Sequence, residues 1–204
     1  LSSLNVSTWV VSSVTDMEAM LYGCSSLETV DLASWDTSHV ADMRFLFGCC
    51  ESLKELDVSR WNTGRVTDME YLFDGCSSLE SIDVSGWNVA RVANMGSMFS
   101  GCVSLGALDV ANWNVSKATD MGRMFTGCES LKGLDLATWN VARVSDMGYM
   151  FGYCSSLRSL DLSAWNTARV TDMSGMLYQC SALTSLDLTG WSTAKVRDAD
   201  YMFD

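Results

Sequence analysis

The chain has 204 residues, 48% of them hydrophobic, and carries a formal net charge of −12. A chain of this length and apolar content can bury a substantial core. The negative charge argues against nucleic acid as a partner, because its phosphates would be repelled, and favours a basic partner. No run of about 20 apolar residues is present, so we expect no direct membrane insertion.

A tryptophan recurs every 26 residues from Trp9 to Trp191, and a cysteine keeps the same step from Cys24 to Cys180. A fixed period of this size indicates a solenoid, in which each unit buries its apolar side only against its neighbours. No proline and no Gly/Ser-rich linker interrupts the register, so we expect residues 1–204 to form a single domain. Both ends of the chain fall inside a repeat, which leads us to expect a fragment that lacks terminal caps.

One repeat, residues 131–156, carries the signals of a strand, a loop and a short helix in that order. The strand is indicated by apolar residues at Leu131, Leu134 and Leu136. The loop brings Trp139 inwards. The helix is indicated by the i, i+3, i+4, i+7 spacing of Met147, Met150, Phe151 and Cys154. We therefore predict an α/β solenoid of about eight such units, with a parallel sheet on one face and short helices on the other.

A column of acidic side chains stands where each helix is predicted to begin. Its members are Asp16, Asp42, Asp68, Asn94, Asp120, Asp146, Asp172 and Asp198. Oxygen atoms of such side chains accept the free N–H groups of a first helical turn, and asparagine does so as well as aspartate. We interpret the column as helix N-caps.

Glycine stands at the predicted helix ends, as at Gly75 and Gly101, where a left-handed conformation is usual. Cys49, Tyr153 and Gln179 replace this glycine in three repeats. Because a side chain makes the left-handed conformation unfavourable, we expect those turns to be strained or to adopt another geometry.

The tryptophan and cysteine columns are expected to lie in the core. Burial of each large side chain contributes about 1.5–3 kcal/mol. The alternative for the tryptophans is an exposed aromatic platform for sugar rings or pigments. The cysteines are interpreted as free thiols, because equivalent Cβ atoms on neighbouring rungs would lie about 4.8 Å apart, beyond the usual disulfide range.

The repeat reads L-x-x-L-x-L-x-x-W-N-x-x-x-V-x-D-M-x-x-M-F-x-G-C-x-S. Its strand part resembles the leucine-rich repeat. The whole unit, notably Trp-Asn-Thr/Val, Val-Thr-Asp-Met and Met-Phe-x-Gly-Cys, resembles the BspA-like surface-protein repeats, also called DUF285. This resemblance covers the chain from end to end. It implies a leucine-rich-repeat-type solenoid, a cell-surface or secreted protein of adhesion or recognition type, no catalytic residues, and binding on the strand face.

Seven carboxylates form a column at the outward strand position: Asp31, Asp57, Asp83, Asp109, Asp135, Asp161 and Asp187. One interpretation is that they recruit calcium, a basic partner or a mineral surface. The interpretation we favour is that each accepts hydrogen bonds from the adjoining repeat, because nothing supplies the six to eight ligands of a calcium site, and so no metal site is predicted. Lys132 and Arg158 extend this candidate binding face where a neighbouring column becomes basic.

Aromatic residues on the outer face of the predicted helices form a second candidate binding surface. They are Phe45, Tyr71, Tyr149 and Tyr201. Aromatic side chains often anchor protein interfaces. The alternative is ordinary variation of surface residues.

Catalysis has little support in the sequence. The only histidine, His39, replaces the arginine or lysine of its column. No nucleotide-binding, zinc-binding or nucleophile motif is present, so we expect neither an enzyme nor a cofactor. The favoured hypothesis is a binding module for a protein or a glycan. Its alternatives are a structural linker within a larger assembly, and a calcium or mineral-surface binder that uses the aspartate column.

Overall fold

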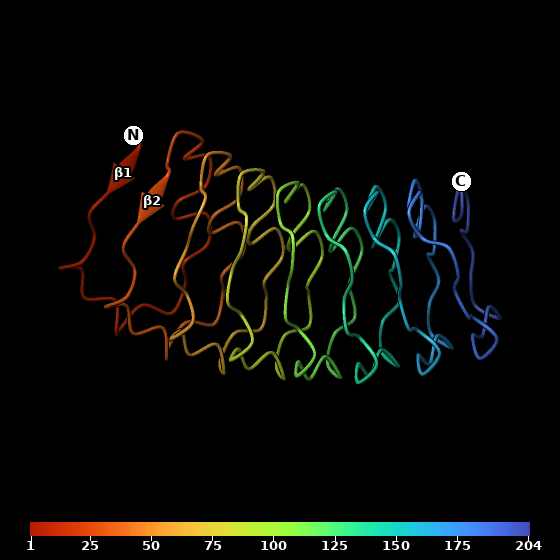
Figure 1. The fold of residues 1–204 in the computed structure, drawn as a ribbon. Coiled ribbons are helices and arrows are strands. Elements are labelled where there is room, and N and C mark those ends of the chain that lie inside the picture. Colours follow the sequence, from red (N-terminus) through yellow and green to blue (C-terminus); the bar gives the residue numbers. More distant parts are fainter.

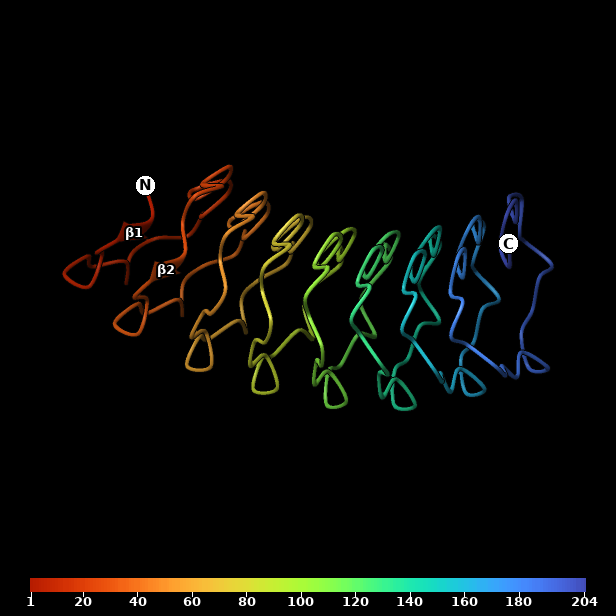
Figure 2. The ribbon, with the colours of Figure 1, turned by 45° about the horizontal axis from the view of Figure 1, so that its top comes forward.

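The computed structural model describes residues 1–204 as a stack of coils, in which each repeat makes one circuit (Figure 1). The N-terminus lies at one end of the stack and the C-terminus at the other. Each coil is a flattened loop, and its tight bends form two rows along the stack (Figure 2). The predicted repeat architecture is therefore confirmed.

The strand side of the coils carries the two strands, β1 at Ser3–Leu4 and β2 at Thr29–Val30, which pair in parallel. Further along the stack, single hydrogen bonds run back to the preceding coil, as from the Arg158 N–H to the Lys132 carbonyl at 3.1 Å. An isolated parallel bridge also pairs Gly133 with the next coil. The parallel direction is as predicted, but a continuous sheet is not formed.

The turn side of the coils, residues 146–154 and their equivalents, contains none of the predicted helices. Alternate N–H groups donate forward to the next coil, as from Tyr149 to the Ser174 carbonyl at 2.7 Å. The N–H groups between them close i→i+3 turns, as from Met150 to Met147 at 3.1 Å. Tyr149 has a φ of 52°, a left-handed value that interrupts a right-handed helix. The helix prediction was wrong because a run of consecutive turns gives the same spacing of apolar residues as a helix. In this run the N–H groups that do not close a turn bond to the next coil.

The acidic column predicted to cap helices forms a ladder of parallel bridges instead. The ladder runs without a break from the Asp16–Asp42 bridge to the Asp172–Asp198 bridge. In each coil the side-chain Oδ1 accepts an N–H from two residues later, as Asp146 does from Gly148 at 2.9 Å. These side chains therefore close a turn rather than begin a helix.

The glycines predicted at helix ends do adopt left-handed conformations, with a φ of 69° at Gly101. A Cβ atom there would lie 3.3 Å from the Cα atom of Gly75 in the preceding coil, so this position is also a close approach of two backbones. Cys49, Tyr153 and Gln179 hold φ values of 59°, 61° and 57° at equivalent positions. Those turns keep the left-handed geometry and its strain rather than adopting another one.

The tryptophans form one stacked column through the core. The centroids of adjacent indole rings lie 6.2–6.4 Å apart. The rings are nearly parallel, with interplanar angles of 8° or less. The six from Trp35 to Trp165 are buried, whereas Trp9 is 49% exposed and Trp191 is half-buried. Core packing is thus confirmed for the six central tryptophans.

The cysteine column belongs to the same buried cluster as the tryptophans. Five of its members, Cys50, Cys76, Cys102, Cys128 and Cys154, are completely buried. Their thiols donate to carbonyl groups of the preceding coil, as Cys102 does to Phe73 at 3.3 Å. Burial raises the pKa of the Cys128 thiol to about 12, which keeps it protonated and unreactive.

Candidate functional site

The seven aspartates of the strand-side column are exposed, and the first of them, Asp31, directly follows β2. Each Oδ1 accepts the N–H from two residues later, as Asp57 does from Ser59 at 3.1 Å. The Ser59 hydroxyl, 2.7 Å from the same oxygen, is the main reason that the pKa of Asp57 lies below its usual value. The aspartates do accept hydrogen bonds, but the prediction that the donors belong to the adjoining repeat was wrong, because the donors lie two residues later in the same coil. The column is therefore an array of carboxylates with fixed orientations.

Lys132 and Arg158 occupy adjoining coils on the strand side, and both are exposed. Neither forms an ion pair within the chain. At the equivalent positions nearer the N-terminus, Lys54 and Glu28 lie 4.0 Å apart and partly compensate each other. The basic end of this surface is thus free to meet a partner's acidic groups.

An open hollow of about 560 Å³ lies on the strand side across three coils. Asp83 and Asp109 of the predicted column line it, together with the small residues Ser81, Ala107 and Gly133. The hollow exists because these side chains are short, and a Cβ atom on Gly133 would meet nothing within 4 Å. Sequence reasoning missed the hollow. The sequence does carry a signal for it, because the residue at this position is Ser81, Ala107 and then Gly133 in three consecutive repeats.

The aromatic residues of the second predicted surface are largely engaged with one another. Phe45 and Tyr71 are half-buried and stack face to face at 4.6 Å. Tyr149 packs over Gly175, where an added Cβ would lie only 2.3 Å from its ring, and the Arg123 guanidinium covers it at 5.0 Å. Only Tyr201 is well exposed, at 64%. These contacts reduce the aromatic surface that a partner could reach.

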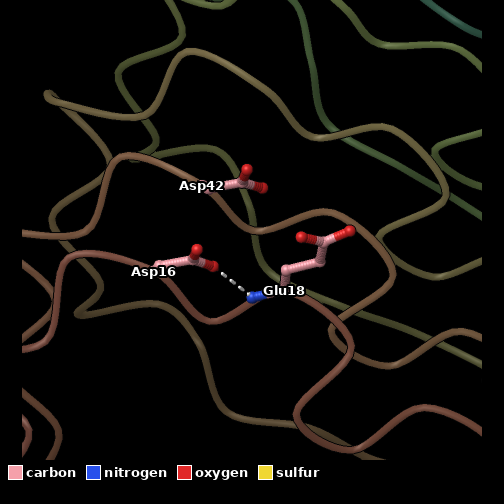
Figure 3. A group of neighbouring side chains, drawn as sticks. All are labelled: Asp16, Glu18 and Asp42. Atoms are coloured by element: carbon pink, nitrogen blue, oxygen red, sulfur yellow. Dashed lines mark hydrogen bonds between the residues drawn. The ribbon is translucent and has the colours of Figure 1, made fainter.

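Three carboxylates of the first two coils, Asp16, Glu18 and Asp42, come within 4.8 Å of one another (Figure 3). Their geometry could suit a cation. The guanidinium of Arg44 already binds two of them, at 2.7 Å from Asp42 Oδ2 and 3.0 Å from Glu18 Oε2. The chain's own arginine therefore supplies the compensating charge.

His39 lies exposed beside Ser38, with its Nδ1 3.1 Å from the hydroxyl oxygen. Neither the strand-side hollow nor four other hollows of the surface include this pair. A nucleophile and a base need a site that positions a substrate beside them. The geometry around His39 fits a surface residue, as the sequence predicts.

The sequence profile of DUF285, described as a Mycoplasma protein of unknown function, matches residues 2–107 and 105–204. None of the curated protein sequences compared with the chain is similar to it. No helix in the structure is long and apolar enough to cross a membrane.

Three solved structures match the chain at low sequence identity. The leucine-rich repeat protein TpLRR of T. pallidum is 22% identical, with a TM-score of 0.56 over 84% of this chain and 72% of its own. TLR13, solved in complex with ssRNA13, is 18% identical, with a TM-score of 0.45 over 87% of this chain and 23% of its own. A leucine rich cell surface protein of Faecalibacterium prausnitzii is 16% identical, with a TM-score of 0.26 over 98% of this chain and 83% of its own. The likeness to TpLRR supports a leucine-rich-repeat-type fold.

Proposed function

This chain belongs to the DUF285 family, and we propose that it is a non-enzymatic recognition module that binds a protein partner through its strand side. The apolar residues of the repeat are mostly used inside, where 59 buried residues form one cluster. What remains for function is a rigid, polar surface. A cell-surface or secreted location and a role in adhesion, which the BspA-like resemblance implies, are part of this proposal.

The observation that carries the proposal is the strand-side hollow. A partner's side chain can enter it, because the lining residues Ser81, Ala107 and Gly133 are small. Asp83 beside it is held by the Ser85 N–H at 3.1 Å and by the Ser85 hydroxyl at 2.7 Å. Pre-oriented acceptors lose little conformational freedom when a partner binds.

The charges around the hollow favour one orientation of a bound partner. The carboxylates of Asp83 and Asp109 line it. The exposed cation Lys132 lies beside Gly133 on the third coil of the hollow, and Arg158 lies on the next coil towards the C-terminus. A partner with a basic group at one end and an acidic group at the other matches this order. Complementary charges of this kind favour one orientation and one partner over others.

The test uses the size of residue 133 as its variable. Gly133→Tyr is expected to fill the hollow, because a Cβ atom at this position would meet nothing within 4 Å, whereas Gly133→Ala leaves most of the hollow open. We expect a partner captured from the native source by the wild-type chain to be retained by Gly133→Ala and lost by Gly133→Tyr. Equal capture by both variants would contradict binding at the hollow. A glycan array with the same three proteins distinguishes a sugar ligand from a protein.

A further inference from the structure

A second groove, of about 260 Å³, lies on the turn side and crosses five neighbouring coils. It is half a coil away along the chain from the strand-side hollow and shares no residue with it. Its lining is mostly polar and contains four carboxylates, from Glu70, Asp120, Asp146 and Asp172, but only one basic group, from Arg123.

The groove exists because three consecutive repeats have no side chain at one position. The residue two places after the acidic ladder is Glu18, Arg44 or Glu70 in the first three repeats and then becomes Gly96, Gly122 and Gly148. A Cβ atom on Gly122 would lie 2.9 Å from Asp146 Oδ1, and one on Gly148 would lie 3.1 Å from Asp172 Oδ1. The carboxylate of each following coil therefore leans into the space that the glycine leaves.

Arg44 shows what occupies this position when a side chain is present. Its Nε lies 3.0 Å and 2.9 Å from the two carboxylate oxygens of Asp42. Its Nη2 reaches Glu18 in the preceding coil at 3.0 Å. A guanidinium at this column thus bridges carboxylates of two adjacent coils. Planar, forked donors suit such bidentate contacts better than the compact ammonium of lysine does.

The carboxylates of the groove have no such partner. The ion pairs of the chain involve Arg44 and Lys54 and none of the groove residues. Arg123, on the groove wall, lies 5.0 Å over the ring of Tyr149. Burial, with added repulsion from Asp120 and Asp172, raises the pKa of Asp146, because it outweighs the opposing effects of the Gly148 N–H and of the Arg123 charge. At Asp42 burial acts in the same direction, but the bonds from Arg44 outweigh it and the pKa is lowered.

We propose that this groove binds an arginine side chain of a protein partner, whose guanidinium bridges the carboxylates of adjoining coils as Arg44 bridges Asp42 and Glu18. The Oδ1 atoms of Asp120 and Asp146 are held by the N–H groups of Gly122 and Gly148, both at 2.9 Å, so the carboxylates are already oriented. This surface is separate from the strand-side hollow, and the inference does not depend on that site.

The experiment titrates the whole chain with two short peptides that differ only in carrying arginine or citrulline, its uncharged isostere. We expect the arginine peptide to bind, and the citrulline peptide to bind at least about tenfold more weakly, because the charge-assisted bonds are lost. A lysine peptide is expected to lie between them. No binding of the arginine peptide, or equal binding of arginine and citrulline peptides, would overturn the proposal.

Variants locate the site. Asp146→Asn keeps the turn, because Asn94 already accepts the equivalent bond from Gly96 at 3.0 Å, but it removes a charge and is expected to weaken arginine binding about tenfold. Glu129→Gln removes the same charge from an exposed position outside both the groove and the strand-side hollow and is the matched control. Equal weakening by both would show general attraction to an acidic surface and would overturn the proposal. Gly122→Arg supplies an internal guanidinium and is expected to block binding of the arginine peptide. If Gly122→Arg does not fold, Asp146→Asn alone tests the site.

Discussion

The indole Nε1 of Trp113 donates a hydrogen bond of 3.0 Å to the carbonyl oxygen of Val84 in the preceding coil. The same side chain is 2% exposed and stacks at 6.4 Å between Trp87 and Trp139. Trp113 thus packs against the coils on both sides of its own and is also hydrogen-bonded to the preceding one.

Trp113→Ala should lower the free energy of unfolding by about 3–5 kcal/mol, because it leaves a large cavity and removes the donor to Val84. Denaturant unfolding measures this change. Trp9→Ala is the matched control, because Trp9 is 49% exposed and its loss should cost clearly less. Equal costs at the two positions would contradict the inward packing of the column.

The turn residues Gly101 and Gln179 should respond in opposite directions to substitution, because both hold left-handed conformations, with φ values of 69° and 57°. Gly101→Ala should destabilise by about 1–2 kcal/mol, and Gln179→Gly should stabilise by up to about 1 kcal/mol. Thermal unfolding of the two variants checks the signs. A stabilising Gly101→Ala would show that the strain has been misassigned.

Thiol labelling should divide the cysteines into two groups. Cys49, Cys24 and Cys180 are partly exposed, whereas the five central members of the column are buried. We expect Cys49, which lies on a surface turn, to react first with a maleimide, and the buried five to react only after unfolding, as resolved by mass spectrometry of digests. Early modification of Cys102 would be inconsistent with this core.

Asp146→Asn should raise the melting temperature at pH 7. Burial raises the pKa of this carboxyl in the folded state, so its favourable contribution is present below the pKa of the unfolded chain and is lost as the pH rises through the folded pKa. The advantage of the variant over the wild type should therefore shrink below about pH 4, where the unfolded-state carboxyl is also protonated. Melting curves across this range measure the trend, and a variant advantage that grows in acid would contradict it.

Asp135→Asn should leave stability nearly unchanged. Asp135 is exposed, and its Oδ1 accepts a single long bond of 3.3 Å from the Ala137 N–H, which an asparagine oxygen can also accept. Its column should thus tolerate loss of one charge without loss of the fold, as denaturant unfolding can verify. A clear loss of stability would show that the ionised form makes a specific contribution.

Whether a repeated position is buried or exposed was predictable from the sequence. A residue type that recurs at the same position of every repeat occupies the same surroundings in every coil. Trp113 and Cys102 were placed in the core for this reason, and Asp57 on the outside. The helices were not predictable in this way. The spacing from Met147 to Cys154 fits both a helix and a run of turns, and the deciding factor is whether N–H groups bond within the segment or to the next coil.

The candidate sites depend on departures from the repeat, which the periodic pattern hides. Gly133 and Ala107 open the strand-side hollow, and Gly122 and Gly148 open the turn-side groove, although each looks like ordinary variation along the sequence. Their effect arises only when neighbouring coils place several small residues side by side. Tyr149 shows the reverse case, because an apparent surface aromatic is covered by Arg123 and Gly175 from the two adjacent coils.

The backbone bonds between coils point forward on the turn side, as at Tyr149, and backward on the strand side, as at Arg158. Peptide dipoles add up along an α-helix because they share one direction, which gives a helix opposite partial charges at its termini. Here the backward bonds oppose the forward ones, which reduces the net dipole along the stack. Charged side chains therefore contribute a larger share of the electric field of this molecule than they do beside an α-helix, in which every peptide dipole points the same way.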